Sequence, residues 1–279
     1  MALRLRKVDG YQALTLWWLA YPLIGIFAGF IAGLFGVGGG LTLVPLILML
    51  FAAQGFPLEN IMHQALATAM ATIVFTSISS MRAHHVHGAV RWDIVKVLTP
   101  GLVCGTLGGS MFTGMIPTRV LAVAFTFVVC CAALLMIFEY RPKPHRGLPG
   151  GPALFGAGVA FGIVTSLVAA GGGFMTIPFM LFCNVSIYQA LGTSSALGLP
   201  IAVAGAIGYI IAGWGESNLP PYSFSFVYLP AFVGIVALSI LAAPFGAKLA
   251  HSLPVKPLKR AFGAFLALLA AKMLYSLFA

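Results

Sequence analysis

The stretch Gly36-Val-Gly-Gly-Gly-Leu-Thr-Leu-Val-Pro45 places four glycines and a proline in an apolar region, where an uninterrupted helix accommodates neither residue well. A second copy occurs at Gly171-Gly-Gly-Phe-Met-Thr-Ile-Pro178. In both copies three glycines are followed by four residues and a proline, with Thr42 and Thr176 in between. Glycine lets the backbone leave helical geometry, and proline suits the first turn of a new helix. The pattern predicts two broken helices, each restarting with its proline in the first turn.

The composition around these stretches indicates a polytopic membrane protein. Hydrophobic residues make up 61% of the 279 residues and charged residues 7%, which is too little polar surface for a water-soluble globule. The net charge of +10 comes from basic residues gathered in short connections, so it does not indicate a nucleic-acid partner. The four cysteines show no metal-ligand spacing, and we interpret them as buried small hydrophobes. No metal or cofactor is predicted.

Apolar runs long enough to cross the hydrocarbon core predict about eight spanning helices. Two shorter apolar runs, 41–53 and 174–183, follow the glycine clusters directly and are expected to form short broken or re-entrant helices. The expected spans are 14–35, 62–81, 94–114, 118–138, 153–170, 187–212, 224–247 and 260–279.

The polar, proline-rich segment 141–151 divides the chain into a first transmembrane repeat, 1–140, and a second, 152–279. The two parts share more than the glycine clusters. Gln64-Ala-Leu-Ala-Thr68 corresponds to Gln189-Ala-Leu-Gly-Thr193. Gly109 and Pro117 also match Gly246 and Pro254 in spacing. Three matches in the same order indicate an internal repeat.

The repeat predicts an inverted topology if each glycine-centred pair is a hairpin returning to its own side. Each half then crosses the membrane three times, so the halves run in opposite directions. This arrangement puts the basic connections 82–92, 141–146 and 248–260 on the cytoplasmic side, and the connections that hold Glu59 and Glu216 outside. It leaves the basic N-terminus outside. The alternative, in which each broken pair crosses once, brings the N-terminus inside but moves 248–260 outside.

The glycine clusters are the candidate substrate site. A helix that restarts inside the membrane has N–H groups without intrahelical partners and a partial positive charge, so two such ends would bind an oxyanion. Neutral side chains nearby would add hydrogen-bond donors. The candidate residues are Gly38, Gly39, Gly40, Thr42, Gln64, Thr68, Gly171, Gly172, Gly173, Thr176, Gln189, Thr193, Ser194 and Ser195, with Pro45 and Pro178 as structural breaks. The alternative is that these residues only support tight helix crossing.

The charged residues restrict the kind of substrate. All five carboxylates are expected near helix ends or in loops, which argues against cation transport and against a carboxylate proton relay. His84, His85 and His87 are expected in a solvated connection rather than at a metal site. An intramembrane hydrolase using Ser194 or Ser195 is the enzymatic alternative, but the histidines at 63, 145 and 251 lie at or near helix ends.

Two further sets of glycines recur every fourth residue and therefore fall on one helical face. They are Gly25, Gly29 and Gly33 in the first expected span, and Gly101, Gly105 and Gly109 in the third. Small residues at this spacing allow close helix packing, so we expect two glycine seams.

Taken together, the paired Gly-Gly-Gly-x4-Pro motif, the charged central segment and the Gln-Ala-Leu-x-Thr repeat resemble the TauE/SafE sulfite exporter family over essentially the whole chain. The resemblance implies a multi-pass permease of the bacterial inner membrane that moves sulfite or a related sulfur-containing anion such as an organosulfonate. By position, the motif residues are the three glycines and the proline of each copy. One departure is that Pro45 to Gln64 spans eight more residues than Pro178 to Gln189.

The residues predict a secondary transporter of a small anion, bound near the membrane midplane and released by alternating access, and the resemblance implies that this anion contains sulfur and is exported. The expected partners are the anion and the lipid bilayer, with no nucleic acid, and a homo-oligomer is left open. An anion channel or an anion-sensing membrane protein would use the same site without alternation.

Overall fold

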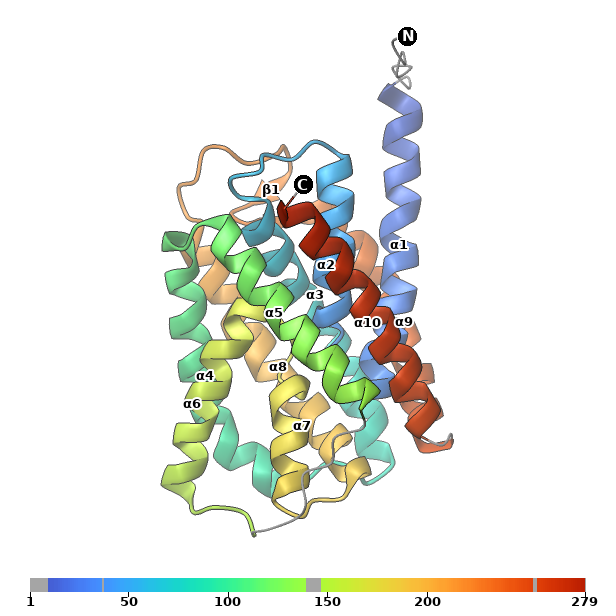
Figure 1. Cartoon of the computed structure of the whole chain (residues 1–279), viewed down its shortest axis with the longest axis vertical. Helices are drawn as coiled ribbons and strands as arrows, with labels where there is room; N and C mark the ends of the chain where they lie inside the picture. The colour runs from blue at the N-terminus through green and yellow to red at the C-terminus, as the bar shows by residue number, and fades with distance from the viewer. Residues whose placement is uncertain (1–9, 37, 139–146, 253–254, 279) are drawn as a thin grey trace.

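A computed structural model describes residues 10–36, 38–138, 147–252 and 255–278 of the chain (Figure 1). The described residues form ten α-helices packed around a common core. A short hairpin, with two residues in each strand, precedes α9. The elements are α1 (Gly10–Phe35), α2 (Gly40–Ala53), α3 (Ile61–Val86), α4 (Trp92–Phe112), η1 (Thr113–Met115), α5 (Thr118–Ile137), α6 (Gly151–Val168), α7 (Gly173–Phe182), α8 (Ile187–Ala212), β1 (Ser223–Phe224), β2 (Val227–Tyr228), α9 (Leu229–Ser252) and α10 (Val255–Phe278).

Six of the helices, α3, α4, α5, α6, α8 and α9, are long and apolar enough to cross a membrane. The helices α1 and α10, which correspond to the other two expected spans, contribute the shorter apolar stretches Leu19–Phe35 and Phe262–Tyr275 within the described residues. The two short helices predicted after the glycine clusters are present as α2 and α7. The chain is therefore a nearly all-helical, multi-pass membrane protein.

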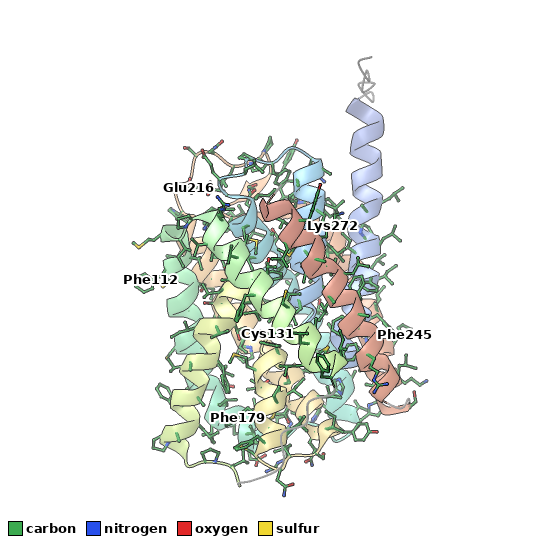
Figure 2. The ribbon with its side chains drawn as sticks, in the orientation of Figure 1. Phe112, Cys131, Phe179, Glu216, Phe245 and Lys272 are labelled. Carbon is green, nitrogen blue, oxygen red and sulfur yellow. The ribbon has the colours of Figure 1, made fainter. Side chains whose placement is uncertain are left out.

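Large apolar side chains cover the outside of the bundle. Phe112 and Phe245, 65% and 70% exposed, project outward from α4 and α9 (Figure 2), as lipid-facing side chains do. Cys183 is buried, but Cys104 is exposed on α4, so the expectation that all four cysteines are buried is wrong. A periodicity of small and large apolar residues does not distinguish a core-facing position from a lipid-facing one, because both environments are apolar.

Two close helix pairs join the first half of the chain to the second. In the first pair α1 packs along α9, and in the second α4 packs along α6. A Cβ added at Gly29 would lie 2.4 Å from the carbonyl oxygen of Ser239, and one added at Gly105 would lie 2.2 Å from that of Val159. The predicted glycine seams are confirmed, and each one lets a helix of one half lie directly on the backbone of the other half.

The predicted helix breaks are also confirmed. The chain leaves α1 after Phe35 and enters α2 at Gly40, and it leaves α6 after Val168 and enters α7 at Gly173. The residues preceding the new helices, Gly39 and Gly172, have φ angles of 77° and 85°. A side chain is strained in this left-handed region, which explains the requirement for glycine at both positions.

The expected place of the prolines is wrong. Pro45 and Pro178 are each the sixth residue of their helix, in the second turn rather than the first. The glycines alone therefore form the break. Each proline removes the N–H that would bond to the carbonyl four residues earlier, so it loosens the start of a helix that has already begun.

The connection between α8 and α9 also differs from the expected boundary. The sequence predicts a span from residue 224, whereas the chain first forms a hairpin, with Ser223 paired to Tyr228, and α9 begins at Leu229. Phe226 at the hairpin turn is buried and stacks on His63 with ring centroids 5.0 Å apart. This contact fixes the hairpin on α3 and so sets where α9 starts.

Candidate substrate site at the two helix breaks

The two glycine clusters lie in direct backbone contact. A Cβ built on Gly38 would lie 2.9 Å from the Cα of Gly171. One built on Gly40 would lie 1.6 Å from the carbonyl oxygen of Ala169. We call this contact, formed by residues 36, 38–40 and 169–173, the break junction. It brings together the starts of α2 and α7, as the candidate site requires.

The amides at the start of both helices give the break junction its positive character. The carbonyl oxygen of Gly39 accepts from the amides of Thr42 and Leu43, and that of Gly172 accepts from Met175 and Thr176. The amides of the first residues of each helix have no acceptor within the helix. No side chain caps either N-terminus, since the capping positions are glycines. An anion placed here would meet two helix N-termini.

The candidate threonines of the two short helices are fully buried and bond backward. Thr42 Oγ1 donates to the carbonyl oxygen of Gly39 at 2.7 Å. Thr176 Oγ1 lies 2.9 Å from the carbonyl oxygen of Gly172 and 3.1 Å from Ser194 Oγ. Both hydroxyls therefore stabilise the left-handed turn that precedes the helix.

Ser194 connects the two breaks. Its hydroxyl donates to the carbonyl oxygen of Gly36 at 2.9 Å, and its Oγ also faces Thr176. The neighbouring Ser195 donates to the carbonyl oxygen of Leu191 and lies 3.2 Å from Ser80 Oγ. Among the candidates, Thr42, Thr176 and Ser194 are thus the side chains that hydrogen-bond to the break junction, and Ser194 is the one that connects its two parts.

Thr68 and Thr193 have a different setting. Each is buried, and each hydroxyl oxygen accepts a 3.0 Å hydrogen bond from a backbone amide, Tyr228 N for Thr68 and Arg91 N for Thr193. Tyr228 is the residue before α9, and Arg91 is the residue before α4. The two threonines therefore hold the chain where another helix begins, and they do so in matching ways.

Gln64 and Gln189 correspond in sequence but not in environment. Gln64 is fully buried on α3, and neither its Nε2 nor its Oε1 has a hydrogen-bond partner among the described residues. Gln189 is half-buried in the first turn of α8, where its backbone amide bonds to Ser186 Oγ. An unpartnered buried amide is costly, which makes Gln64 the more informative of the two.

Ser77 is a candidate that sequence reasoning missed. It is buried, with 2% of its surface exposed, and its Oγ has no partner among the described residues. A Cβ on Gly198 would lie 3.0 Å from Ser77 Oγ and 3.1 Å from the carbonyl oxygen of Gly171, so the hydroxyl lies beside the break junction. The signal was the run of Ser and Thr residues at positions 68, 72, 76, 77 and 80 within one apolar helix.

The charged and titratable residues lie mostly at the ends of the bundle. The described carboxylates, Glu59, Asp93 and Glu216, are exposed, and Figure 2 shows Glu216 at the end that carries the hairpin. Asp9 and Glu139 lie outside the described residues. His84 corrects one expectation, because α3 continues to Val86 and buries this histidine, with Nε2 2.9 Å from the carbonyl oxygen of Gly33. The neighbouring His85 and His87 are exposed as expected.

The comparisons with known proteins agree on a membrane transporter. The family model described as "Sulfite exporter TauE/SafE" matches residues 21–273. A "Probable membrane transporter protein" of Haemophilus influenzae is 34% identical over 253 residues, which cover 90% of this chain and 96% of the relative. The "Probable membrane transporter protein YdhB" of Bacillus subtilis is 27% identical, with 86% and 91% coverage. In MamO of Magnetospirillum gryphiswaldense, 24% identical, the match covers 96% of this chain and 46% of the relative. No solved structure matches the chain.

Proposed function

Because this chain belongs to the sulfite exporter TauE/SafE family, we propose that it exports a small sulfur-containing anion, sulfite or an organosulfonate, from the bacterial cytoplasm. The observation that carries the proposal is the break junction, where two helix N-termini start from glycine clusters in direct contact. Amides and helix dipoles bind an oxyanion without a formal positive charge. Such a site suits a ligand that must also be released on the other side.

The substrate would be held by backbone amides of residues 38–40 and 171–173, with the hydroxyl of Ser77 as a neutral donor, while Ser194, which donates to the carbonyl oxygen of Gly36, would position the first break. Ser77 supports this assignment because its hydroxyl is buried without a partner beside the junction. Gln64 is a second buried donor without a partner, near the start of α3 and about 20 Å along the helix from Ser77, so it would line the substrate path rather than the junction. A sulfur oxyanion accepts hydrogen bonds at several oxygens, so it would satisfy donors that the protein leaves unpaired.

The proposed mechanism is alternating access between two inverted repeats, 1–140 and 152–279, joined by 141–151. The helix packing supports it, because exchanging the halves converts the α1–α9 pair into the α6–α4 pair and the α2–α3 pair into the α7–α8 pair. The matching amide bonds to Thr68 and Thr193 support it too. In transporters built this way, one repeat rocks against the other around a fixed site.

The proposed direction follows from charge. Arg82, Lys96 and Lys248 are exposed and lie in or beside the connections that we assign to the cytoplasm, as the distribution of basic residues in short loops favours. With a negative interior, a monoanion gains about 2.3 kcal/mol per 100 mV on leaving the cell. Export of such an anion therefore needs no coupling ion.

The test is flux of labelled sulfite from proteoliposomes, with and without an imposed potential. We expect saturable efflux that is faster when the interior of the liposome is negative. Unlabelled sulfite on the outside should stimulate the efflux of labelled sulfite. Efflux that neither saturates nor shows counterflow would indicate an anion channel. No efflux of sulfite or of related sulfonates would reject the proposal.

A variant of Ser77 tests the site itself. Removing the hydroxyl in Ser77→Ala takes away one donor and creates no unpaired partner, so we expect the KM for sulfite to rise by roughly 5–10-fold with the fold intact. Ser252→Ala is the matched control, because Ser252 is exposed at the end of α9 and bonds only locally to the carbonyl oxygen of Leu249. An unchanged KM in Ser77→Ala would remove this residue from the site.

A further inference from the structure

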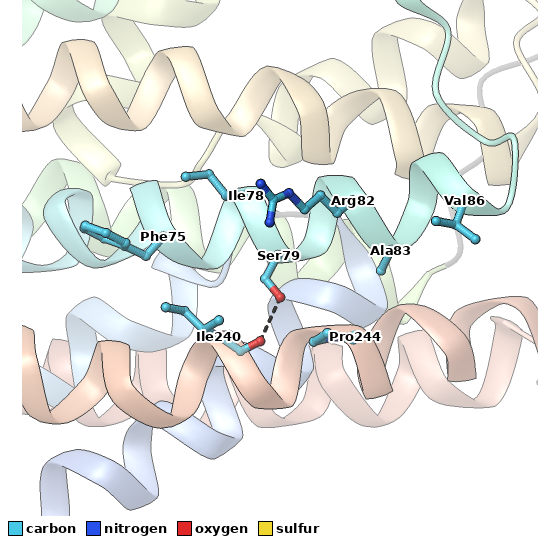
Figure 3. A pocket seen from close by; sticks show the side chains of 8 residues that line it. All are labelled: Phe75, Ile78, Ser79, Arg82, Ala83, Val86, Ile240 and Pro244. Carbon is cyan, nitrogen blue, oxygen red and sulfur yellow. Dashed lines mark hydrogen bonds between the residues drawn. The ribbon is translucent and has the colours of Figure 1, made fainter.

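An open groove of about 470 Å³ lies between α3 and α9, away from the break junction (Figure 3). Its walls are mostly apolar. The side chains that form it include Phe75, Ile78 and Val86 on α3, Ile240 and Pro244 on α9, and a single charged residue, Arg82. Phe75 is 40% exposed and Val86 84% exposed, so the groove opens on the outer surface of two helices able to span a membrane.

The two polar side chains of the groove, Ser79 and Arg82, differ in whether they already have a partner. Ser79 Oγ donates to the carbonyl oxygen of Ile240 at 2.7 Å (Figure 3). This hydrogen bond links α3 to α9, so the Ser79 hydroxyl is not free to donate to a ligand. Arg82 is exposed, and its side chain runs back along α3 beside Ile78 and Ser79 (Figure 3). No carboxylate among the residues that the structure describes forms an ion pair with Arg82, because Asp93 pairs with Arg91 and Glu59 and Glu216 lie in other connections.

A second cation continues the same line. Ile240, Pro244 and Lys248 follow one another at four-residue spacing and therefore share a face of α9. Lys248 is exposed, one turn beyond the groove. The surface thus changes along its length from apolar at Phe75 and Ile240 to positively charged at Arg82 and Lys248. A ligand that fits it has an apolar chain and an anionic head.

We propose that this groove binds an anionic phospholipid, with an acyl chain against Phe75, Ile78 and Ile240 and the phosphate at Arg82. A guanidinium binds phosphate oxygens through paired hydrogen bonds, and basic pockets between membrane helices hold anionic headgroups. A free inorganic anion would leave the apolar wall unused. A zwitterionic lipid would bring its own cation beside Arg82. This proposal is independent of which substrate the protein transports.

The experiment is native mass spectrometry of the full chain, purified in neutral detergent and titrated with phosphatidylglycerol or with phosphatidylcholine of the same acyl chains. We expect adducts of phosphatidylglycerol at least 5-fold more abundant than those of phosphatidylcholine. The variant Arg82→Gln should lose that preference. Arg119→Gln is the matched control, because Arg119 is also exposed but lies in the first turn of α5, outside the groove. This variant should keep the preference for phosphatidylglycerol.

A second variant tests the apolar part. Ala83 lines the groove and is partly exposed, so Ala83→Phe fills it without changing any charge; this variant should reduce phosphatidylglycerol adducts about as much as Arg82→Gln. Inorganic phosphate at millimolar concentration should not displace the lipid. Equal adducts of both lipids in the wild type, or full binding in both variants, would overturn the proposal. Displacement by phosphate alone would overturn it in favour of a free-anion site.

Discussion

Of the described glycines, Gly40 is the one whose added Cβ would come closest to the other half of the chain. A Cβ there would lie 1.6 Å from the carbonyl oxygen of Ala169, so Gly40→Ala forces two backbones apart. We expect this single methyl group to cost at least 2 kcal/mol of stability, as an overpacked core position does, and to abolish transport.

The comparison for Gly40→Ala is Gly108→Ala, at a glycine in α4 whose added Cβ meets no neighbouring atom within 4 Å. Helix propensity favours alanine there by up to about 1 kcal/mol, so this variant should be as stable as the wild type or more so. Thermal unfolding in detergent and sulfite efflux measure both effects. Normal transport in Gly40→Ala would show that the halves do not need this contact.

Gln64 separates stability from function at a single residue. Its amide is buried without a partner, so replacing it by the similarly shaped methionine removes a desolvation cost of about 1–3 kcal/mol. We expect Gln64→Met to raise the melting temperature while it lowers sulfite transport. A variant that is less stable but still active would contradict the assignment of Gln64 to the substrate path.

The control for Gln64→Met is Gln189→Met. Gln189 is the corresponding residue of the second half but is half-buried in the first turn of α8. Its side chain escapes most of the desolvation cost, so the melting temperature should change little. A similar rise in both variants would indicate a general effect of methionine rather than relief of a buried amide.

Among the helices, Thr68 and Thr193 link the centre of the bundle to the starts of α9 and α4. Thr68→Val and Thr193→Val each leave a partly buried amide without its acceptor, at a cost of about 1–2 kcal/mol. We expect both variants to unfold at lower temperature with an unchanged KM for sulfite, and Thr→Ser at either position to restore stability. A raised KM without loss of stability would instead place these hydroxyls on the substrate.

The sequence predicts the helices and breaks better than it predicts which segments pack against one another. Glycine and proline act locally, so both breaks, both short helices and both glycine seams are visible in the sequence. The start of α2 is set by the contact of Gly40 with Ala169, which no local pattern contains, and this explains why Pro45 falls in the second turn. His84 was misplaced for a similar reason. Its burial depends on α3 extending to Val86 and reaching the carbonyl oxygen of Gly33.

The candidate site shows the same limit. Its backbone part could be predicted because the two clusters repeat a motif. Its side chains could not, because sequence equivalence says nothing of what surrounds a residue. Gln64 and Gln189 match in sequence and differ in burial, whereas Ser77 corresponds to the apolar Ala202 and lies beside the junction.

For the whole molecule, the two ends of the bundle differ in charge, and this predicts its orientation in the membrane. In a variant whose four native cysteines are replaced by serine, Ser217→Cys lies in the exposed connection before the hairpin and His87→Cys in the exposed connection after α3. A membrane-impermeant maleimide should label residue 217 in intact cells, and residue 87 only after permeabilisation. Labelling with the opposite sidedness would reverse the proposed direction of transport.

During synthesis, α1 is made long before α9, the helix that covers its glycine face. About two hundred residues separate the two helices, and at roughly 5–20 residues per second the interval is on the order of 10–40 s. Helix α6 has no such delay, since its partner α4 is already made when α6 emerges. The packing of the first half is therefore complete only after α9 of the second half has been made. A nascent chain that stops before Leu229 leaves Gly25, Gly29 and Gly33 facing lipid. Membrane proteases would recognise such truncated chains by the uncovered glycine face of α1 and degrade them.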